Sequence, residues 1–492
     1  MPASLAKYYP PDAPEAKGLD QVADAERQER KERIDRYWRY YDGKHDKPLK
    51  VTPGKRDDNQ IINLASQAID KLVAFFVGPK APQFQLPNET PQPGDESQAQ
   101  QKLDAFWKAN DLESFITDLA LAGFVSGHPF IKLLPLQDGQ ETPEIAVLDT
   151  RHVTVFWDAL NAKRALWYRL QWTVSAGTET ERRQDILPAW ILADQPQPDP
   201  TSPWVILEYE RDRNKLGGKW QEIHRADWAY PFAPILHRKN APAPHKFYGE
   251  SDLKHIQIND GVNFVVTNTG RIIKRYAQPT TVAIGANMDK IKETSIDGVW
   301  ELPPGADLRN VEMSSDLGSS LAFYSMLRAA FFTQMRVVDW ATQADKVGQL
   351  TNFGLRVLFA DMLDNVNGKR RVYGDLLCEA SQHALLMMGE VNADKPTANW
   401  MDPLPKNRLE MVQAATLEAK LGPAGASPRT LATELGRDYD QEKKFKEETL
   451  SEGTDALADV MNRLNTQGFE GGSGGVTALN NPARRTLEMV RF

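Results

Sequence analysis

The sequence of 492 residues contains a single cysteine, Cys378. One thiol excludes an intrachain disulfide, and with it the disulfide-stapled folds of secreted proteins and zinc sites built from several cysteines. Cys378 falls on the apolar stripe of a predicted helix, so we expect it to be a small buried residue. The first fourteen residues lack the apolar segment of a signal peptide. These features predict a reducing compartment.

Long hydrophobic runs and an excess of positive charge are also missing. No stretch of about eighteen uncharged apolar residues occurs, so no membrane-spanning helix and no membrane partner are expected. Lys and Arg number 59 against 67 Asp and Glu, a formal net charge of −8. General coating of nucleic acid needs a surplus of Lys and Arg to displace counterions, and this composition argues against it. This charge remains compatible with a protein that contacts DNA without binding it tightly.

Motifs for catalysis and cofactor binding are absent. Every Gly-Lys pair is followed by His, Arg or Trp, so there is no phosphate-binding loop of the G-x-x-x-x-G-K-[ST] type. No H-E-x-x-H motif occurs, and His237 and His245 flank a Pro-rich turn without the spacing of a helical metal pair. The sequence predicts a protein that is not an enzyme, with no catalytic residue, no metal site and no cofactor.

The residue patterns that are present predict an α+β chain. Residues 21–42 predict a charged helix with an aromatic end, and apolar spacing near 3.6 residues predicts helices over 59–77 and 100–127. From 130 to 240 the pattern changes to short β-branched and aromatic runs separated by turns, which predict a mostly antiparallel sheet. The predicted strands are 130–134, 145–148, 153–157, 165–172 and 204–209.

Long helices dominate the remainder. Ser251 caps a helix predicted to reach about Tyr276, and a small insert with short strands follows. A second helix is predicted over 315–340, with its apolar residues on a heptad seam. A polar segment, 341–350, separates it from a helix of nearly forty residues that begins at Thr351, in which Gly368 permits a kink.

The order of these parts, with several local stretches, carries a resemblance. The stretches are Tyr37-x-x-Tyr40-Tyr41-x-Gly43, Asn59 to Gly78, Tyr248 to Leu253, Ile256 to Asp260 with Asn263, Trp400 to Pro405, and Leu435 to Asp438 with Glu442. In this order they resemble the portal proteins of tailed double-stranded-DNA phages, of the long-tailed siphophage type. The resemblance covers about residues 30–450.

The resemblance implies a portal fold with a mixed α/β wing, a long-helix stem, a small β-containing clip and a helical crown. The implied parts are a flexible N-terminus (1–24), the wing (25–249), stem helix 1 (250–276), the clip (277–314), stem helix 2 (315–340), the tunnel loop (341–352), a long wing or channel helix with its connection (353–404), the crown (405–466) and a flexible tail (467–492).

The function that this resemblance implies is a head-to-tail connector. Such a protein forms a ring with itself, of twelve copies, at one capsid vertex, and double-stranded DNA passes through the ring with low affinity. Its further partners are the terminase large subunit, a head-completion or adaptor protein, and the major capsid and scaffolding proteins. The implied location is the portal vertex of the virion, after assembly in the cytoplasm of the host bacterium.

Candidate channel residues follow from the implied tunnel loop and from a basic stripe. The tunnel-loop candidates are Thr342, Gln343, Asp345, Lys346 and Gln349, with Lys346 the foremost candidate for DNA contact. The stripe comprises Arg271, Lys274 and Arg275, which share one face at the end of the first stem helix. The alternative role of the stripe is to complement the dipole of that helix at its C-terminus.

Two further surfaces are candidate protein contacts. The clip surface comprises Asp289, Lys290, Lys292, Glu293 and Asp297, whose mixed charge suits a reversible partner, the alternative being solubility alone. The stem seam comprises Leu321, Tyr324, Arg328, Phe331 and Met335, which we expect to pack between subunits. Arg328 in this seam needs a partner, and we expect a carboxylate from a neighbouring stem.

Two other function classes stay open. One is an enzyme with a site assembled from scattered residues. Carboxylates of raised pKa in a pocket would support this hypothesis. The other is an oligomeric helical scaffold unrelated to phages. A solid bundle without an axial hole would support this second hypothesis.

Overall fold

The structure is a computed structural model of the chain. It describes residues 19–446 apart from 52, 55, 88–96, 138, 159–160, 176–178, 193–201, 213–218, 245, 278–279, 285–291, 294–299, 302–304, 306, 312–316, 340–351, 405–407, 422–424, 426, 435–438 and 440–441. The described residues fall into two units, one within 1–405 and the other within 406–492. Within them, no helix has both the length and the apolar character needed to cross a membrane.

Four helices open the first unit. They are α1 (Leu19–Tyr41), α2 (Leu64–Val77), α3 (Gln98–Ala109) and α4 (Leu112–Ser126). The single helix predicted over 100–127 is therefore two helices. Asn110 explains the break, because its side-chain amide donates to the carbonyl oxygens of Phe106 and Pro143 and accepts from the N–H of Ile145. The next residue, Asp111, has a positive φ of 44°, which turns the chain into α4.

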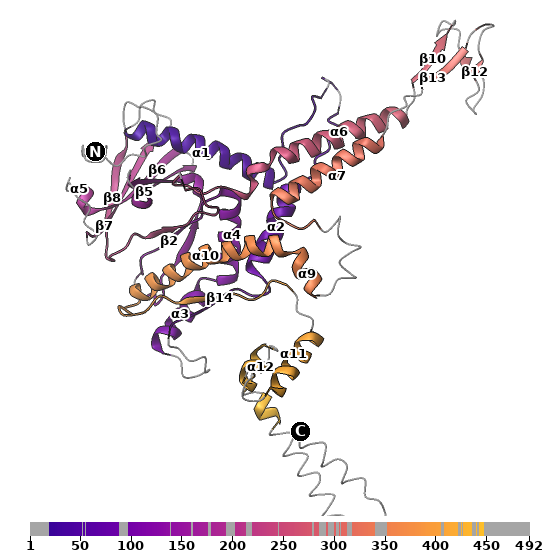
Figure 1. Cartoon of the computed structure of the whole chain (residues 1–492). Helices are drawn as coiled ribbons and strands as arrows, with labels where there is room; N and C mark the ends of the chain where they lie inside the picture. The colour runs from indigo at the N-terminus through magenta and orange to yellow at the C-terminus, as the bar shows by residue number, and fades with distance from the viewer. Residues whose placement is uncertain are drawn as a thin grey trace, which may run out of the picture. The chain divides into compact units, whose positions relative to one another are not determined.

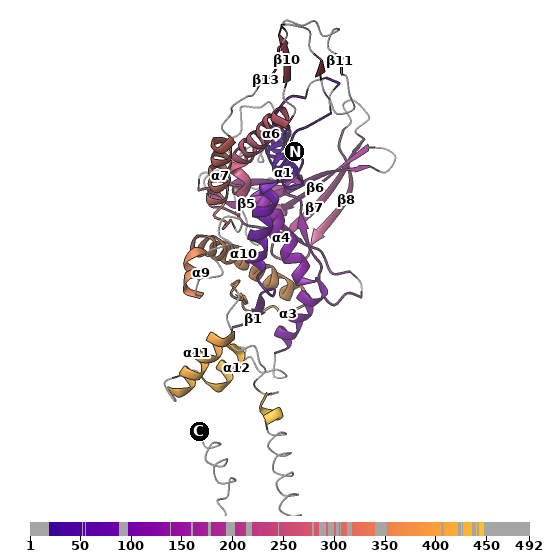
Figure 2. The ribbon, with the colours of Figure 1, turned by 90° about the vertical axis from the view of Figure 1, so that its right-hand side faces the viewer.

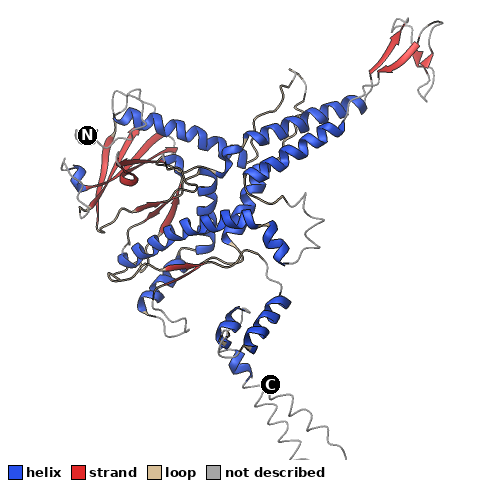
Figure 3. Ribbon diagram, viewed as in Figure 1, coloured by secondary structure: helices blue, strands red, loops and turns tan. Residues whose placement is uncertain are grey.

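The antiparallel sheet predicted for 130–240 is confirmed as two sheets. A three-stranded sheet has the order β3 (Ile145–Leu148), β2 (Phe130–Leu133), β9 (Ile235–His237). A five-stranded sheet follows the chain order β4 (Val153–Asp158), β5 (Asn161–Ser175), β6 (Glu179–Pro188), β7 (Trp204–Asp212), β8 (Gln221–Trp228). A 3₁₀ turn, η2 (Thr150–His152), precedes β4, and α5 (Ala189–Leu192) follows β6. Figure 3 shows the strands gathered on one side of this unit.

Strand β6 escaped prediction because its sequence is charged. The strand buries Arg183 and Asp185 in place of apolar residues, and Arg169 of β5 joins them. The guanidinium of Arg169 donates to Asp185 at 2.8 Å, and Arg183 donates to the same carboxylate. Burying charges is tolerated where they neutralise and hydrogen-bond one another, so a charged run becomes an interior strand.

The long helices form a hairpin (Figure 1). A 3₁₀ turn, η3 (Asp252–His255), leads into α6 (Gln257–Ala277), and α7 (Leu317–Gln334) returns beside it. Strands β10 (Thr280–Ile284) and β13 (Asp307–Val311) pair between the two helices in the chain, as do β11 (Lys292–Glu293) and β12 (Trp300–Glu301).

Helix α7 ends six residues before the predicted boundary at Trp340. Arg336 takes a positive φ of 52°, and the N–H of Val337 bonds back to the carbonyl of Phe332 at 3.0 Å. This is the left-handed helix stop that usually employs Gly or Asn. An Arg at this position gives no sequence signal, which is why the boundary was placed too late.

The helix predicted from Thr351 is interrupted at Phe359, not at Gly368. It consists of α9 (Asn352–Leu358) and α10 (Ala360–Met387). Phe359 is buried and its ring stacks on Phe75 of α2, with 5.4 Å between ring centroids. Helix α10 packs on α2 and α3 and beside β14 (Thr397–Asn399), which pairs with β1 (Gln83–Gln85). Figure 2 shows α10 beside α4.

The second unit is helical where it is described. It contains α11 (Arg408–Lys420) and α12 (Pro428–Glu434). Ser427 caps α12, since its hydroxyl oxygen accepts from the N–H of Thr430 at 3.2 Å.

Candidate assembly and channel surface

Helix α6 is fastened along its length by three polar side chains, four residues apart. Asn259 accepts from the N–H of Leu64 at 3.1 Å, Asn263 from Ile62 at 2.9 Å and Thr267 from Gln60 at 3.0 Å. All three are buried. Residues at this spacing share one helix face, so together they satisfy the backbone of the extended segment before α2. The start of the hairpin is thus tied to the N-terminal helices.

A buried ion pair holds η3 to α10. The ammonium of Lys369 lies 2.8 Å from Asp252 and 2.7 Å from the amide oxygen of Asn240, to which the hydroxyl of Tyr373 also donates. The Lys369 side chain is 4% exposed. Burial lowers the pKa of Lys369 and the Asp252 carboxylate opposes that change. The pair fixes the point where the hairpin leaves the body of the unit.

Two glycines permit a close backbone approach at the same point. Gly127, just after α4, has a positive φ of 86°, and a Cβ there would lie 2.5 Å from the N–H nitrogen of Ser251. A Cβ on Gly249 would lie 2.5 Å from the carbonyl oxygen of Gly127. Only glycine fits either position. The chain entering η3 is therefore pressed directly against the end of α4.

His128 and His237 form a buried pair beside this contact. Their ring nitrogens are 3.0 Å apart, and the other nitrogen of His128 accepts from the N–H of Gly249 at 3.1 Å. Burial is the main cause that lowers the pKa of His237 to about 3 and that of His128 well below its usual value. His237 is thus an interior histidine that binds another side chain. Among the described residues, no cluster of His, Cys, Asp or Glu is arranged to hold a metal ion.

Arg328 of α7 has a partner within its own chain. Its guanidinium lies 2.6 Å from Asp339 and also reaches the hydroxyl of Tyr324. Arg328 therefore does not need the carboxylate of a neighbouring stem that the sequence led us to expect. The early stop of α7 is the reason, because the turn at Arg336 brings Asp339 back beside the helix.

The five seam residues divide between the core and the surface. Phe331 and Met335 are buried by the chain's own elements, and Tyr324 and Arg328 are partly covered. Leu321 is 66% exposed. Phe331 and Met335 therefore belong to the core of the chain itself, not to a surface between subunits. The heptad seam marks the face of α7 that meets its own chain.

A groove opens along the hairpin on the side of the segment before α2. It has a volume of about 540 Å³. Its apolar walls come from Gly261 and Phe264 of α6 and from Phe323 and Leu327 of α7, and its rim is formed by Asp46, Lys47, Pro48 and Asp260. Sequence patterns missed this groove because Phe264 and Phe323 lie on helices that meet only in the folded chain.

The basic stripe is partly engaged. Arg271 pairs with Asp58 at 2.7 Å, so its charge is matched within the chain. Lys274 is exposed. Arg275 lies in α6, and its side chain is outside the described part, as are the side chains of Lys292 and Glu293 in β11. Asp289, Lys290 and Asp297 lie outside the described residues, and so do Thr342, Gln343, Asp345, Lys346 and Gln349.

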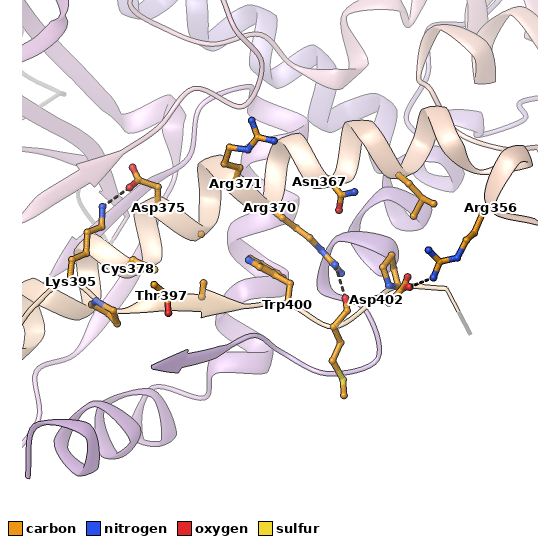
Figure 4. Close-up of a pocket in the computed structure, with 16 residues that line it drawn as sticks. Arg356, Asn367, Arg370, Arg371, Asp375, Cys378, Lys395, Thr397, Trp400 and Asp402 are labelled. Atoms are coloured by element: carbon orange, nitrogen blue, oxygen red, sulfur yellow. Dashed lines mark hydrogen bonds and ion pairs between the residues drawn. The ribbon is translucent and has the colours of Figure 1, made fainter. Parts of the chain in front are cut away.

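An open pocket of about 790 Å³ lies between α10 and residues 395–403 (Figure 4). Arg370 crosses it and donates to the carbonyl oxygens of Phe75, Phe76 and Met401, which closes the C-terminal end of α2. Arg356 pairs with Asp402 at 2.6 Å, and Lys395 pairs with Asp375. Cys378 lines this pocket and burial raises its pKa to about 11, the opposite of a reactive thiol. Arg356, Arg370 and Lys395 of this pocket therefore serve contacts within the chain.

A larger cavity, of about 1200 Å³, lies where α10, η3 and the end of α7 meet. It is bounded by the Lys369–Asp252 pair, the two histidines and the loop 238–247. Two of its charged lining residues are paired within the chain, Lys254 with Glu250 and Arg238 with Asp375.

Residues 20–181 match the family model described as phage portal protein, SPP1 Gp6-like. Over these residues the chain is similar to the phage portal family. The match covers α1 to the start of β6 and confirms the resemblance found in the sequence. It supports a portal connector in a phage-type particle.

Two solved structures are similar at low identity. One is a chain from the neck of a native GTA particle computed with C12 symmetry, with 15% identity, 76% of this chain and 89% of that chain covered, and a TM-score of 0.40. The other is from the neck of an empty GTA particle computed with C6 symmetry, with 14% identity, the same coverages and a TM-score of 0.40. No curated protein matches the chain.

Proposed function

We propose that this chain is a portal protein, the connector between head and tail of a phage-type particle. Twelve copies form a ring at one capsid vertex, and DNA enters and leaves through its axis. The observation that carries the proposal is the family match over residues 20–181. The folded chain agrees with it, because a body of helices and sheets is followed by a two-helix hairpin with short strands between the helices.

The parts of the chain take the portal roles in order. Residues 25–249 form the wing, 250–276 and 315–340 the stem, 277–314 the clip, and 405–466 the crown. Residues 341–352 form the tunnel loop, and 353–404 the long helix with its connection to the crown. The ties at Lys369, Gly127 and Asn263 support this assignment, since a stem that surrounds a channel needs a rigid junction with the wing.

The charge of the assembly suits passage of DNA. Twelve chains of net charge −8 give a ring of about −96, which repels the duplex as a whole. Tight phosphate contacts would hold DNA in place, so positive groups are needed only where they centre the duplex. We propose Lys346 of the tunnel loop for this role, and Lys274 with Arg275 at the end of α6 as secondary contacts. Arg271 is less suited, because Asp58 already neutralises it.

The clip is proposed to receive the partners. During packaging it would bind the terminase large subunit, and afterwards a head-completion protein. Mixed charge over Asp289, Lys290, Lys292, Glu293 and Asp297 would make these contacts reversible and specific, because charged rims affect association rates and partner choice more than affinity. Major capsid and scaffolding proteins would contact the wing and crown.

The experiment that tests the proposal is negative-stain electron microscopy of the purified full-length chain, with its mass measured by light scattering. Rings with a central hole and a mass near twelve subunits are expected. A compact dimer or tetramer without a hole, retained in the presence of its scaffolding protein, would contradict the proposal.

A further inference from the structure

Helix α7 is unusual in its charge. Its eighteen residues include one charged side chain, Arg328, which faces Asp339 of the same chain. Among the helices of eight or more residues in the described part of the chain, α7 alone exposes no charged side chain. It does expose large apolar side chains, Leu321 at 66% and Met326 at 58%, and exposed apolar surface of this kind marks contact sites.

The chain covers only one side of α7. Phe331, Phe332 and Met335 are buried against the rest of the unit. The opposite side carries Ala322, Met326 and Ala329, all exposed, and Met326 is 58% exposed. Because Ala322 and Ala329 on either side are small, the long side chain of Met326 projects furthest from this face.

The groove along the hairpin, whose wall includes Phe264, has charged residues on its rim, but each of them is paired within the chain. Asp260 on its rim accepts from Arg36 and Tyr40, Asp46 accepts from Arg39, and Lys47 pairs with Asp57. Every rim charge is therefore balanced within the chain. The floor exposes Phe264, which is 47% accessible, next to Phe323. Such a groove accepts an apolar, uncharged segment and offers no partner to a charged one.

We propose that the Met326 face of one chain packs into the Phe264 groove of a second copy. The outer face of α7 and the groove are different surfaces of one hairpin, so each chain offers one projection and one recess. In a head-to-tail contact of this kind, every copy uses one surface towards each neighbour. Both surfaces are covered in all copies only when the assembly closes into a ring. This inference rests on the proposed function and names the surfaces by which the copies meet.

Cysteine cross-linking of the full-length chain tests the pairing. The double variant Met326→Cys, Phe264→Cys should give a ladder of covalent multimers under mild oxidation. Each single variant should give no more product than the wild type, because a head-to-tail contact never brings two copies of one residue together. The native Cys378 is buried and contributes little background. A control pair, Met326→Cys with Ile223→Cys on the exposed face of β8, should remain monomeric on a denaturing gel.

Other outcomes separate this inference from the proposed function. Rings in the microscope without a ladder would overturn the pairing and leave the portal function standing. A covalent dimer from Met326→Cys alone would overturn it in favour of a two-fold contact. Absence of both rings and ladder would contradict both proposals. A charge introduced as Met326→Glu should abolish rings without changing the melting temperature, whereas Ile223→Glu should leave rings intact.

Discussion

Individual side chains explain how the hairpin is held to its unit. The side chain of Lys369 is 4% exposed and that of Asp252 is 13% exposed, and burial of one charge without the other is costly because a low-dielectric interior does not solvate it. The family match ends at residue 181, yet these residues lie well beyond it. The ion pair of Lys369 and Asp252 is thus a property of the folded chain that neither the sequence motifs nor the matched family segment indicated.

Replacing Lys369 by Met should lower the free energy of unfolding by about 3 kcal/mol, because the largely covered Asp252 carboxylate then loses its cation and keeps only the hydrogen bond from Asn240. Urea denaturation at pH 7 measures this. The matched control is Lys395→Met, which removes an ion pair whose side chains are 39% and 48% exposed and should cost less than about 1 kcal/mol. Equal losses in the two variants would contradict the role given to Lys369.

The neutral pair of His128 and His237 should make stability depend on pH. In the unfolded chain these rings take up protons near pH 6.5, whereas in the folded chain His237 stays neutral down to about pH 3. Their contribution is therefore present above pH 6.5 and is lost as the pH falls from 6.5 towards 3. Arg238 and Lys239 nearby add to this effect, since positive charge also disfavours protonation.

His237→Gln should remove part of this dependence. Between pH 6.5 and 5, one such histidine should lower the free energy of unfolding by about 2 kcal/mol, since each pH unit contributes at most about 1.4 kcal/mol. Denaturation curves of the variant and the wild type at the two pH values give the difference. His224→Gln, at an exposed position on β8, is the control and should keep the wild-type slope. An unchanged slope in His237→Gln would contradict the assignment.

At the scale of elements, patterns with a clear period were predictable and local exceptions were not. The helix α2 and the antiparallel sheets followed from apolar spacing and turn residues, α1 from its charged run with an aromatic end, and α6 from the cap at Ser251. The short strands expected in the insert are present as β10 and β13. Strand β6 was missed because an internal charge network replaces its apolar residues. The stops at Asn110, Arg336 and Phe359 were missed because each depends on contacts with residues distant in sequence or on a residue that rarely stops a helix.

The candidate site was predictable only in outline. The heptad seam of α7 correctly marked a packed face, but the sequence alone cannot distinguish packing within a chain from packing between chains. Asn259, Asn263 and Thr267 did carry a signal, since three polar residues four positions apart on an apolar helix face indicate a common partner. The groove at Phe264 carried none, because its walls come from two helices separated by some forty residues.

The contact between α4 and the start of the hairpin yields a prediction at this scale. Gly127→Ala should be strongly destabilising, because the new Cβ meets the backbone of Ser251 as well as the positive φ. Gly139→Ala is the matched control, since Gly139 has a similar φ of 88° with no atom near its Cβ position. We expect a loss of about 1 kcal/mol for Gly139→Ala and at least twice that for Gly127→Ala. Thermal unfolding compares them, and similar losses would show that the close approach is unimportant.

At the scale of the whole molecule, the net charge of −8, the uncharged face of α7 and the ties at the base of the hairpin are compatible with the proposed portal ring. A ring that conducts DNA must be held together by contacts that do not attract the duplex, and apolar packing of hairpins meets that requirement. The net charge predicts weak DNA binding by the assembled ring at physiological salt. An electrophoretic mobility assay should show no tight complex with linear duplex, and a complex of nanomolar affinity would contradict a sliding channel.

The central claim is that the α6–α7 hairpins of successive copies surround an axial channel. Cryo-electron microscopy of the purified assembly, reconstructed without imposed symmetry, tests it most directly. The account predicts a closed ring in which the hairpins pack side by side around a hole wide enough for duplex DNA, about 20 Å. A closed assembly with its hairpins at the periphery, or a solid bundle of hairpins without a hole, would contradict it.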